Sequence, residues 1–242
     1  MEELKTYKSI GGFNHEFGIT TLHPLIHVGN MEEAGHIKIE GCYSFNFYAV
    51  YLKDDESGVI KYGRNYYDYQ SGTMLFFAPR QVVCEEGGNA PNRGWVLFFH
   101  QDLLHGTPLG RNLGNYTFFQ YAVNEALHLS DEERSIIIGC FRNLLMELRH
   151  AMDDNSKTLI ISNLELLLNY SKRFYERQFI TRSQANPDFL SRFERILESY
   201  FNTGQLLQQG IPNVKYLADR MNLSANYLSD MLRKHTGKSA SE

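Results

Sequence analysis

Residues 214–237 read VKYLADRMNLSANYLSDMLRKHTG, and this stretch decides the fold of the C-terminal part of the chain. Apolar side chains recur at spacings of three, one and three, which places them on one face of a short helix. They are Val214, Leu217, Ala218 and Met221. A second apolar face follows, formed by Leu228, Met231 and Leu232. Ser224 stands just before it, where serine commonly caps a helix. The stretch therefore predicts two short helices joined by a tight turn.

The residue at position 218 favours a close crossing of these helices. Alanine there lets the two backbones approach, whereas a larger side chain would push them apart. Two short helices that cross in this way are typical of a helix-turn-helix. The alternative is a small structural hairpin with a solvated polar face.

The residues around this motif resemble the first helix-turn-helix of AraC/XylS-type transcription regulators over about 50 residues. The matching pieces are Leu217-Ala218, Leu223-Ser224, Tyr227-Leu228-Ser229, Arg233-Lys234 and Thr236-Gly237-Lys238-Ser239. Upstream, residues 95–110 and 118–129 (FFQYAVNEALHL) resemble the sensor-to-linker region of the family's Bacteroidetes members.

The resemblance implies that Ser224 to His235 is a recognition helix that enters the major groove of promoter DNA. Its candidate DNA-binding residues are Ser224, Asn226, Tyr227, Ser229, Asp230, Arg233 and Lys234. Asn226 suits a bidentate pair with adenine, Ser229 a base or a phosphate, and Asp230 a cytosine. Arg233 and Lys234 suit phosphates. Asp230 can instead pair with Arg233.

Family members carry two such units, and this sequence ends at Ser241-Glu242, where the helix leading to the second unit is expected. We therefore expect a chain interrupted within its DNA-binding domain. A single recognition helix implies weak binding to double-stranded promoter DNA, because fewer phosphates are contacted.

Two longer helices precede this region. Ser130 and Glu133 form a capping box, which opens a helix with Ile137, Phe141, Leu144, Leu145 and Leu148 on one face. A second helix is expected from Lys157 to Phe179, with an unusually wide leucine stripe. That stripe fits either an intrachain core or a homodimer interface. The polar residues 181–186 predict a boundary, and Pro187 a first helical position of the next helix.

The first half reads as β structure. Aromatic and β-branched runs at 36–52, 74–83 and 94–100 alternate with turn-forming segments, which favours a sandwich or barrel. Within 44–51 the large side chains do not alternate cleanly, so the strand faces stay unassigned. By resemblance this half is a cupin-like sensor for a small-molecule effector.

The sequence thus predicts an α+β chain in three parts. Residues 1–121 form the cupin-like β domain, 122–184 a helical linker and dimerisation hairpin, and 185–242 the partial helix-turn-helix domain. The β domain's aromatic residues are candidates for an apolar effector pocket, although such residues also simply fill cores. The candidates are Tyr43, Phe45, Phe47, Phe76, Trp95 and Phe98.

No metal, cofactor or catalytic site is predicted. None of the nine histidines has the spacing of metal-binding cupins. The sequence contains no nucleophile elbow, phosphate loop or dinucleotide fingerprint. Effector binding is therefore expected without a metal. The alternatives to a ligand-responsive regulator are a metal-dependent cupin enzyme with a helical tail and a dimeric interaction module.

Composition fits an ordinary globular protein, with 43% hydrophobic and 21% charged residues. The net charge of -4 gives no overall sign of nucleic-acid binding, although residues 185–242 carry +1 and the remainder -5. Neither a secretory signal nor a membrane-spanning stretch is evident, which predicts a cytoplasmic protein. Three cysteines, Cys42, Cys84 and Cys140, lack close pairing and are expected to be reduced thiols.

Overall fold

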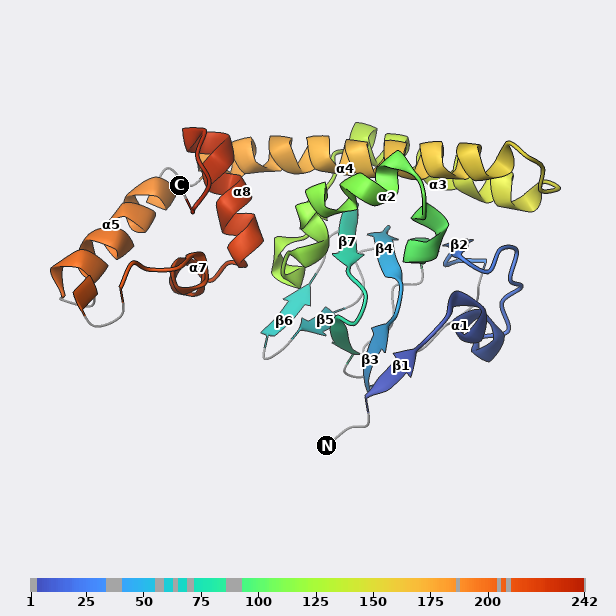
Figure 1. Ribbon diagram of the computed structural model, residues 1–242, viewed down its shortest axis with the longest axis horizontal. Coiled ribbons are helices and arrows are strands. Elements are labelled where there is room, and N and C mark those ends of the chain that lie inside the picture. Colours follow the sequence, from blue (N-terminus) through green and yellow to red (C-terminus); the bar gives the residue numbers. More distant parts are fainter. Residues whose placement is uncertain are drawn as a thin grey trace.

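The computed structural model describes residues 4–33, 41–54, 59–62, 65–68, 72–85, 93–185, 188–203, 206–207 and 210–241. The chain is a mixed α+β protein (Figure 1). Strands occupy its first half, a long helical hairpin runs across them, and a group of shorter helices follows at the C-terminal end.

The described strands form two separate five-stranded sheets rather than one closed barrel. The central sheet has the order β10-β7-β4-β9-β2, and its strands are Leu127–His128, Thr73–Phe77, Tyr48–Lys53, Gly94–Phe99 and Ile26–Asn30. The outer sheet has the order β1-β3-β8-β5-β6, and its strands are Lys5–Tyr7, Gly41–Phe45, Val82–Glu85, Val59–Tyr62 and Asn65–Asp68. Pairing is antiparallel except between β1 and β3.

The helices are α1 (Ile10–Glu16), α2 (Pro108–Asn112), α3 (Asp131–Arg149), α4 (Ser156–Ala185), α5 (Asp188–Asn202), α7 (Val214–Met221) and α8 (Ala225–Thr236). Four short 3-10 turns link β9 to β10: η1 (Gln101–Leu104), η2 (Leu113–Asn115), η3 (Thr117–Gln120) and η4 (Val123–Glu125). None of the helices in the described ranges is long and apolar enough to cross a membrane.

The central sheet is buried on both faces. Along β9, Leu97 and Phe99 face the helical layer, whereas Phe98 faces the outer sheet. This alternation follows from the two-residue period of a strand, which sends successive side chains to opposite faces. The sheet therefore connects two cores, one shared with the helices and one shared with the outer sheet.

The two long helices pack together over the central sheet (Figure 1). The predicted capping box is confirmed, because Ser130 Oγ accepts from the Glu133 amide and the Glu133 carboxylate accepts from the Ser130 amide. All five predicted core residues of α3 are buried: Ile137, Phe141, Leu144, Leu145 and Leu148. In α4, Leu164, Leu167 and Leu168 are buried, but Leu159 and Leu166 are exposed. The wide stripe thus serves the intrachain core on one side only.

Two expectations about element boundaries were wrong, and one open question is answered. Helix α4 continues through the polar residues after Thr181 as far as Ala185, so no break occurs there. Residues 101–125 form helical turns rather than strands, and α1 interrupts the β region near the N-terminus. Residues 44–51 are not one strand: β3 ends at Phe45 in the outer sheet and β4 begins at Tyr48 in the central sheet, which explains the broken alternation. Asn186 and Pro187, and residues 36–40, lie outside the described residues.

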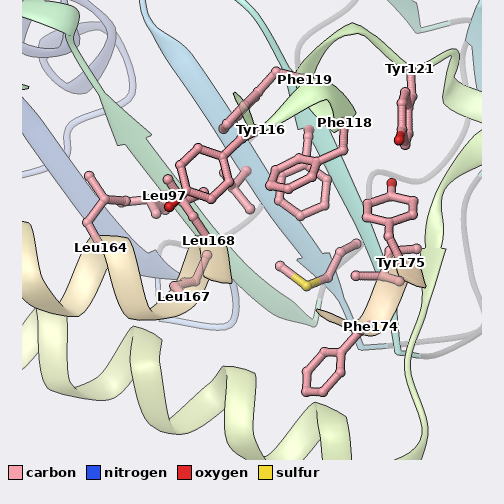
Figure 2. Close-up of a cluster of buried hydrophobic side chains, with 14 of the residues drawn as sticks. Leu97, Tyr116, Phe118, Phe119, Tyr121, Leu164, Leu167, Leu168, Phe174 and Tyr175 are labelled. Atoms are coloured by element: carbon pink, nitrogen blue, oxygen red, sulfur yellow. The ribbon is translucent and has the colours of Figure 1, made fainter. Parts of the chain in front are cut away.

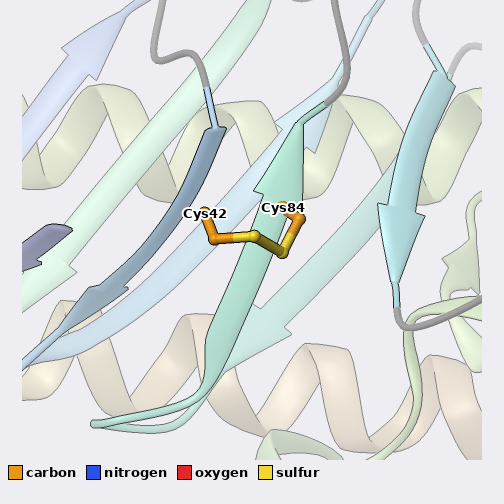
Figure 3. The surroundings of a disulfide bond; sticks show 2 residues. All are labelled: Cys42 and Cys84. Atoms are coloured by element: carbon orange, nitrogen blue, oxygen red, sulfur yellow. A yellow bond between two sulfur atoms is a disulfide. The ribbon is translucent and has the colours of Figure 1, made fainter. Parts of the chain in front are cut away.

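The expectation of three reduced thiols was also wrong. Cys42 and Cys84 lie directly opposite each other on the antiparallel strands β3 and β8 and form a disulfide (Figure 3). Cys140 is a free, buried thiol on α3. The pairing depends on strand register, which joins residues 42 positions apart and was not evident from cysteine spacing.

Candidate functional site

Helices α7 and α8 are joined by a tight turn whose geometry follows from the local sequence. Asn213 caps α7 by accepting from the Tyr216 amide at 2.8 Å. Asn222 ends α7 in the left-handed region at φ 57°, a conformation that asparagine adopts more readily than most residues. Ser224 then caps α8, and its hydroxyl accepts from the Tyr227 amide. Only two residues, Leu223 and Ser224, separate the αL position from the next helix.

The inner faces of the pair are those expected from the apolar spacing, except that Val214 is only half-buried. The buried side chains are Leu217, Ala218, Met221, Leu228, Met231 and Leu232. Ala218 is almost completely enclosed, which fits a crossing that leaves no room for a larger residue. Helix α5 packs beside α7, where Tyr200 meets the Tyr216 ring edge-on at 5.1 Å. The buried side chains of α7 and α8 continue the core that the helical layer shares with the central sheet.

Tyr227 does not lie on the outer face of α8. Its side chain is 1% exposed, and its ring packs edge-on against Tyr121 and Phe179 at about 5 Å. The Arg182 guanidinium of α4 donates to its hydroxyl at 2.7 Å. Burial raises the pKa of this phenol. Tyr227 is therefore a packing residue between α8 and α4 and is not part of an exposed surface of α8.

The N-terminus of α8 is occupied by a carboxylate from another part of the chain. Glu125, in η4, accepts from the Ser224 amide at 2.6 Å and also binds the Ser224 hydroxyl. A third bond, 2.7 Å long, comes from the Ala122 amide. Burial is the main effect on Glu125 and raises its pKa, while these hydrogen bonds oppose the rise. The positive end of a helix dipole is a favourable place for such an anion.

Asp230 makes the second contact of this kind. Its carboxylate accepts hydrogen bonds from the hydroxyls of Thr117 at 2.5 Å and Tyr121 at 2.7 Å, both in or next to η3. It also pairs with Arg233 at 3.2 Å, as the spacing of three residues allowed. The Asp230 side chain is 16% exposed, whereas that of Arg233 is 58% exposed. Burial and the nearby Asp230 charge raise the pKa of Tyr121, so its hydroxyl stays protonated as a donor.

Two further candidate residues also contact the rest of the chain. Asn226 donates to the side-chain oxygen of Gln120 at 2.5 Å. Lys234 pairs with Glu176 of α4 at 3.1 Å. Ser229 is half-buried. The structure thus gathers Ser224, Asn226, Asp230 and Lys234 on the side of α8 that faces η3, η4 and α4.

Residues 117–125 lie between α8 and the central sheet. Phe118 packs at a tilt against Phe76 of β7 with ring centroids 4.5 Å apart, and Phe119 meets Tyr48 of β4 edge-on at 4.9 Å. Figure 2 shows this aromatic cluster, with Tyr121 and Tyr175 pointing toward each other. The same segment supplies Thr117, Gln120, Tyr121 and Glu125 to α8. We call it the bridging segment.

Sequence reasoning did not assign a role to these partners of α8. They are Thr117, Gln120, Tyr121, Glu125, Glu176 and Arg182. The nearest signal was the run FFQYAVNEALHL, whose resemblance pointed to a linker region. No local spacing could pair its polar residues with side chains about a hundred positions away.

The aromatic residues proposed for an effector pocket divide between two cores. Tyr43, Phe45, Phe47 and Phe98 lie between the two sheets. Phe76 and Trp95 lie on the opposite face of the central sheet, where Trp95 stacks on Phe141 of α3. The six residues therefore do not line one space. Phe13 of α1 packs into the core between the sheets, with its ring 5.0 Å from that of Phe98.

The histidines that the structure describes show no arrangement that would hold a metal. Within the described ranges, no three His, Cys, Asp or Glu side chains gather closely enough to bind an ion. His27, on β2, lies beside the Phe98 ring at 5.8 Å, and burial lowers its pKa to about 4. Its imidazole is therefore neutral near pH 7.

Comparison with known proteins gave no assignment. No family model matches the chain, and no curated protein matches it.

Proposed function

We propose that this chain is a ligand-responsive, DNA-binding transcription regulator of the AraC/XylS type. In this proposal the two sheets are a cupin-like sensor, α3 and α4 are a linker, and α7 and α8 are a helix-turn-helix. The observation that carries it is the α7–α8 pair. Two capped helices cross at the enclosed Ala218, and Asn226, Asp230 and Arg233 lie on the side of α8 away from that crossing.

The chemistry of α8 supports DNA as the partner. Recognition helices present polar side chains to base edges near their N-termini and cations to phosphates. Asn226 lies in the first turn and can pair with adenine, whereas Arg233 and Lys234 lie in the last turns. The small charge of this region implies modest affinity, because few counterions are released on binding.

A homodimer is part of the proposal. Leu159 and Leu166 are seven residues apart on α4, each about 45% exposed, and Ile180 lies fourteen residues beyond Leu166 with a similar exposure. Residues that repeat every seven positions stay on one side of a helix that packs against a partner. The exposed side of the α4 leucine stripe, which the intrachain core does not cover, is thus a surface for a second copy.

A small-molecule effector is expected between the two sheets, where Phe13 now lies among Phe45 and Phe98. Displacing this side chain would open an apolar space of the kind that binds small ligands.

We propose a cytoplasmic location because the regulator must reach chromosomal DNA. The Cys42–Cys84 disulfide does not follow from that location, since cytoplasmic reductants normally keep thiols reduced.

The test is a selection from random-sequence duplexes at low salt, followed by titration of the recovered duplex. The wild-type chain should enrich a defined motif. Asn226→Ala should weaken the chain's preference for one base at one position by about 1–3 kcal/mol. Arg233→Ala should remove about one phosphate contact, which lowers the slope of the logarithm of the binding constant against the logarithm of the salt concentration by about one. Asn112→Ala, at an exposed position of α2, is the matched control and should bind as the wild type does. A pool that stays random, with no measurable duplex binding, would refute the proposal.

A further inference from the structure

The bridging segment covers the part of α8 that a DNA duplex would need. It binds the α8 N-terminus through Glu125, the first turn through Gln120, and Asp230 through Thr117 and Tyr121. These bonds use the same polar groups that a recognition helix turns toward base edges. Sensor and DNA therefore compete for one surface.

Glu125 has a particular place in this competition. Phosphate groups bind well at helix N-termini, where free amides and the helix dipole meet the anion. The Glu125 carboxylate accepts from the Ser224 amide and binds the Ser224 hydroxyl at that position. It thus takes the position of a backbone phosphate, and it is buried there rather than exposed to solvent.

The covering contact is connected to the sheets that form the proposed sensor. Phe118 and Phe119 anchor the bridging segment on the central sheet, against Phe76 and Tyr48. A shift of these strands would therefore move Thr117 and Tyr121, which hold Asp230. On the α4 side, Arg182 binds Tyr227 and Lys234 pairs with Glu176.

We infer that this structure is a closed, autoinhibited state, in which the bridging segment masks the DNA-reading side of α8 and must separate from it before DNA binds. The inference rests on the proposed function. It assigns the acidic Asp230 a role as the sensor's attachment point. It also makes the apparent DNA affinity depend on the fraction of open molecules, since only those can bind.

The experiment weakens the closed state from the sensor side only. In the full chain, Thr117→Val with Tyr121→Phe removes both hydroxyl donors to Asp230 and leaves α8 unchanged. An Asp230 carboxylate without these two donors destabilises the closed state alone, because water hydrates the carboxylate in the open state. Tyr116→Phe is the matched control: it removes a hydroxyl beside η3 that binds Asn169 of α4 instead of α8. Glu125→Gln is a second, independent opening variant.

Two quantities are measured: hydrogen exchange of the α8 amides without DNA, and binding of a labelled random-sequence duplex at low salt. Both opening variants should exchange faster in α8 and bind the duplex about tenfold more tightly than wild type, with Tyr116→Phe unchanged. Faster exchange with wild-type affinity would overturn the inference and leave the proposed function standing. Unchanged exchange in both variants would also overturn it. If no variant binds duplex, the proposed function itself fails.

Discussion

The hydroxyl of Tyr121 donates a 2.7 Å hydrogen bond to the carboxylate of Asp230, a residue 109 positions further along the chain. Both groups are largely shielded from water, and Thr117 donates to the same carboxylate oxygen. Contacts of this kind fix the position of α8 relative to the strands.

This bond should be measurable as a coupling free energy. Tyr121→Phe and Asp230→Asn should each lower the free energy of unfolding by about 1–2 kcal/mol, and the double variant by clearly less than their sum. Chemical denaturation of the four proteins gives the coupling. The same cycle with Tyr116→Phe in place of Tyr121→Phe should be additive, since Tyr116 bonds to Asn169. Additivity in the first cycle would exclude an energetic link.

Reduction of the Cys42–Cys84 disulfide should destabilise the chain. The bond closes a loop between residues 42 positions apart. A disulfide that closes a loop of such length typically adds about 2–4 kcal/mol to the free energy of unfolding. Adding dithiothreitol should therefore lower Tm by about 5–10 °C in a chain of this size. The variant Cys42→Ser with Cys84→Ser should show the lower Tm regardless of reductant. Three titratable thiols in the unreduced, denatured wild type would contradict the disulfide.

His27 should make stability depend on pH in a defined window. Its folded-state pKa is about 4 and its ordinary value is 6.5, because burial beside Phe98 disfavours the charged ring. Between these values the unfolded chain binds more protons, so stability falls as pH drops from about 6.5 to 4. The loss should approach about 3 kcal/mol. His27→Gln should remove that part of the pH dependence, and an identical profile in the variant would contradict the assignment.

Self-association should depend on the exposed side of α4. Leu166→Glu places a charge at the centre of the proposed dimer face and should convert dimers to monomers at tens of micromolar, on the order of ordinary dimer affinities. Sedimentation velocity distinguishes the two forms. Leu4→Glu is a matched control, because Leu4 is 48% exposed and Leu166 44% exposed, but Leu4 precedes β1 of the outer sheet, on the other side of the central sheet from α4. A wild-type chain that sediments as a monomer would show that the leucines serve another purpose.

Local features of this fold were readable from the sequence. The capping box at Ser130 and Glu133, the buried face of α3 and the α7–α8 turn all depend on residues a few positions apart. Helix α1 was not predicted because Gly11 and Gly12 lower the helix propensity of this segment. In the structure Ser9 caps the helix, and its Ile10 and Phe13 side chains are buried. Helix α4 extends past the predicted end at Phe179 because the polar residues after Thr181 are compatible with a helix, even though they offer no apolar face.

The candidate site was only partly predictable, for a different reason. Spacing identified which residues of α8 face away from α7. The family resemblance added Tyr227 to them, and the sequence could not show that its side chain is buried, because its partners Tyr121 and Phe179 come from distant segments. The division of the aromatic residues between two cores depended on strand register and sheet order. A shift of one residue reverses every side chain of a strand, and no turn in the sequence fixed that register.

The length of α4 has a mechanical consequence. This single helix of 30 residues is about 45 Å long at the usual rise per residue, and it contacts the central sheet's edge strand β10 and α8 along one continuous axis (Figure 1). A stiff rod of that length acts as a lever. A tilt of roughly ten degrees about one end moves the other by about 8 Å. A small repacking beneath the first turns of α4 would therefore be amplified into a large displacement where Arg182 meets Tyr227.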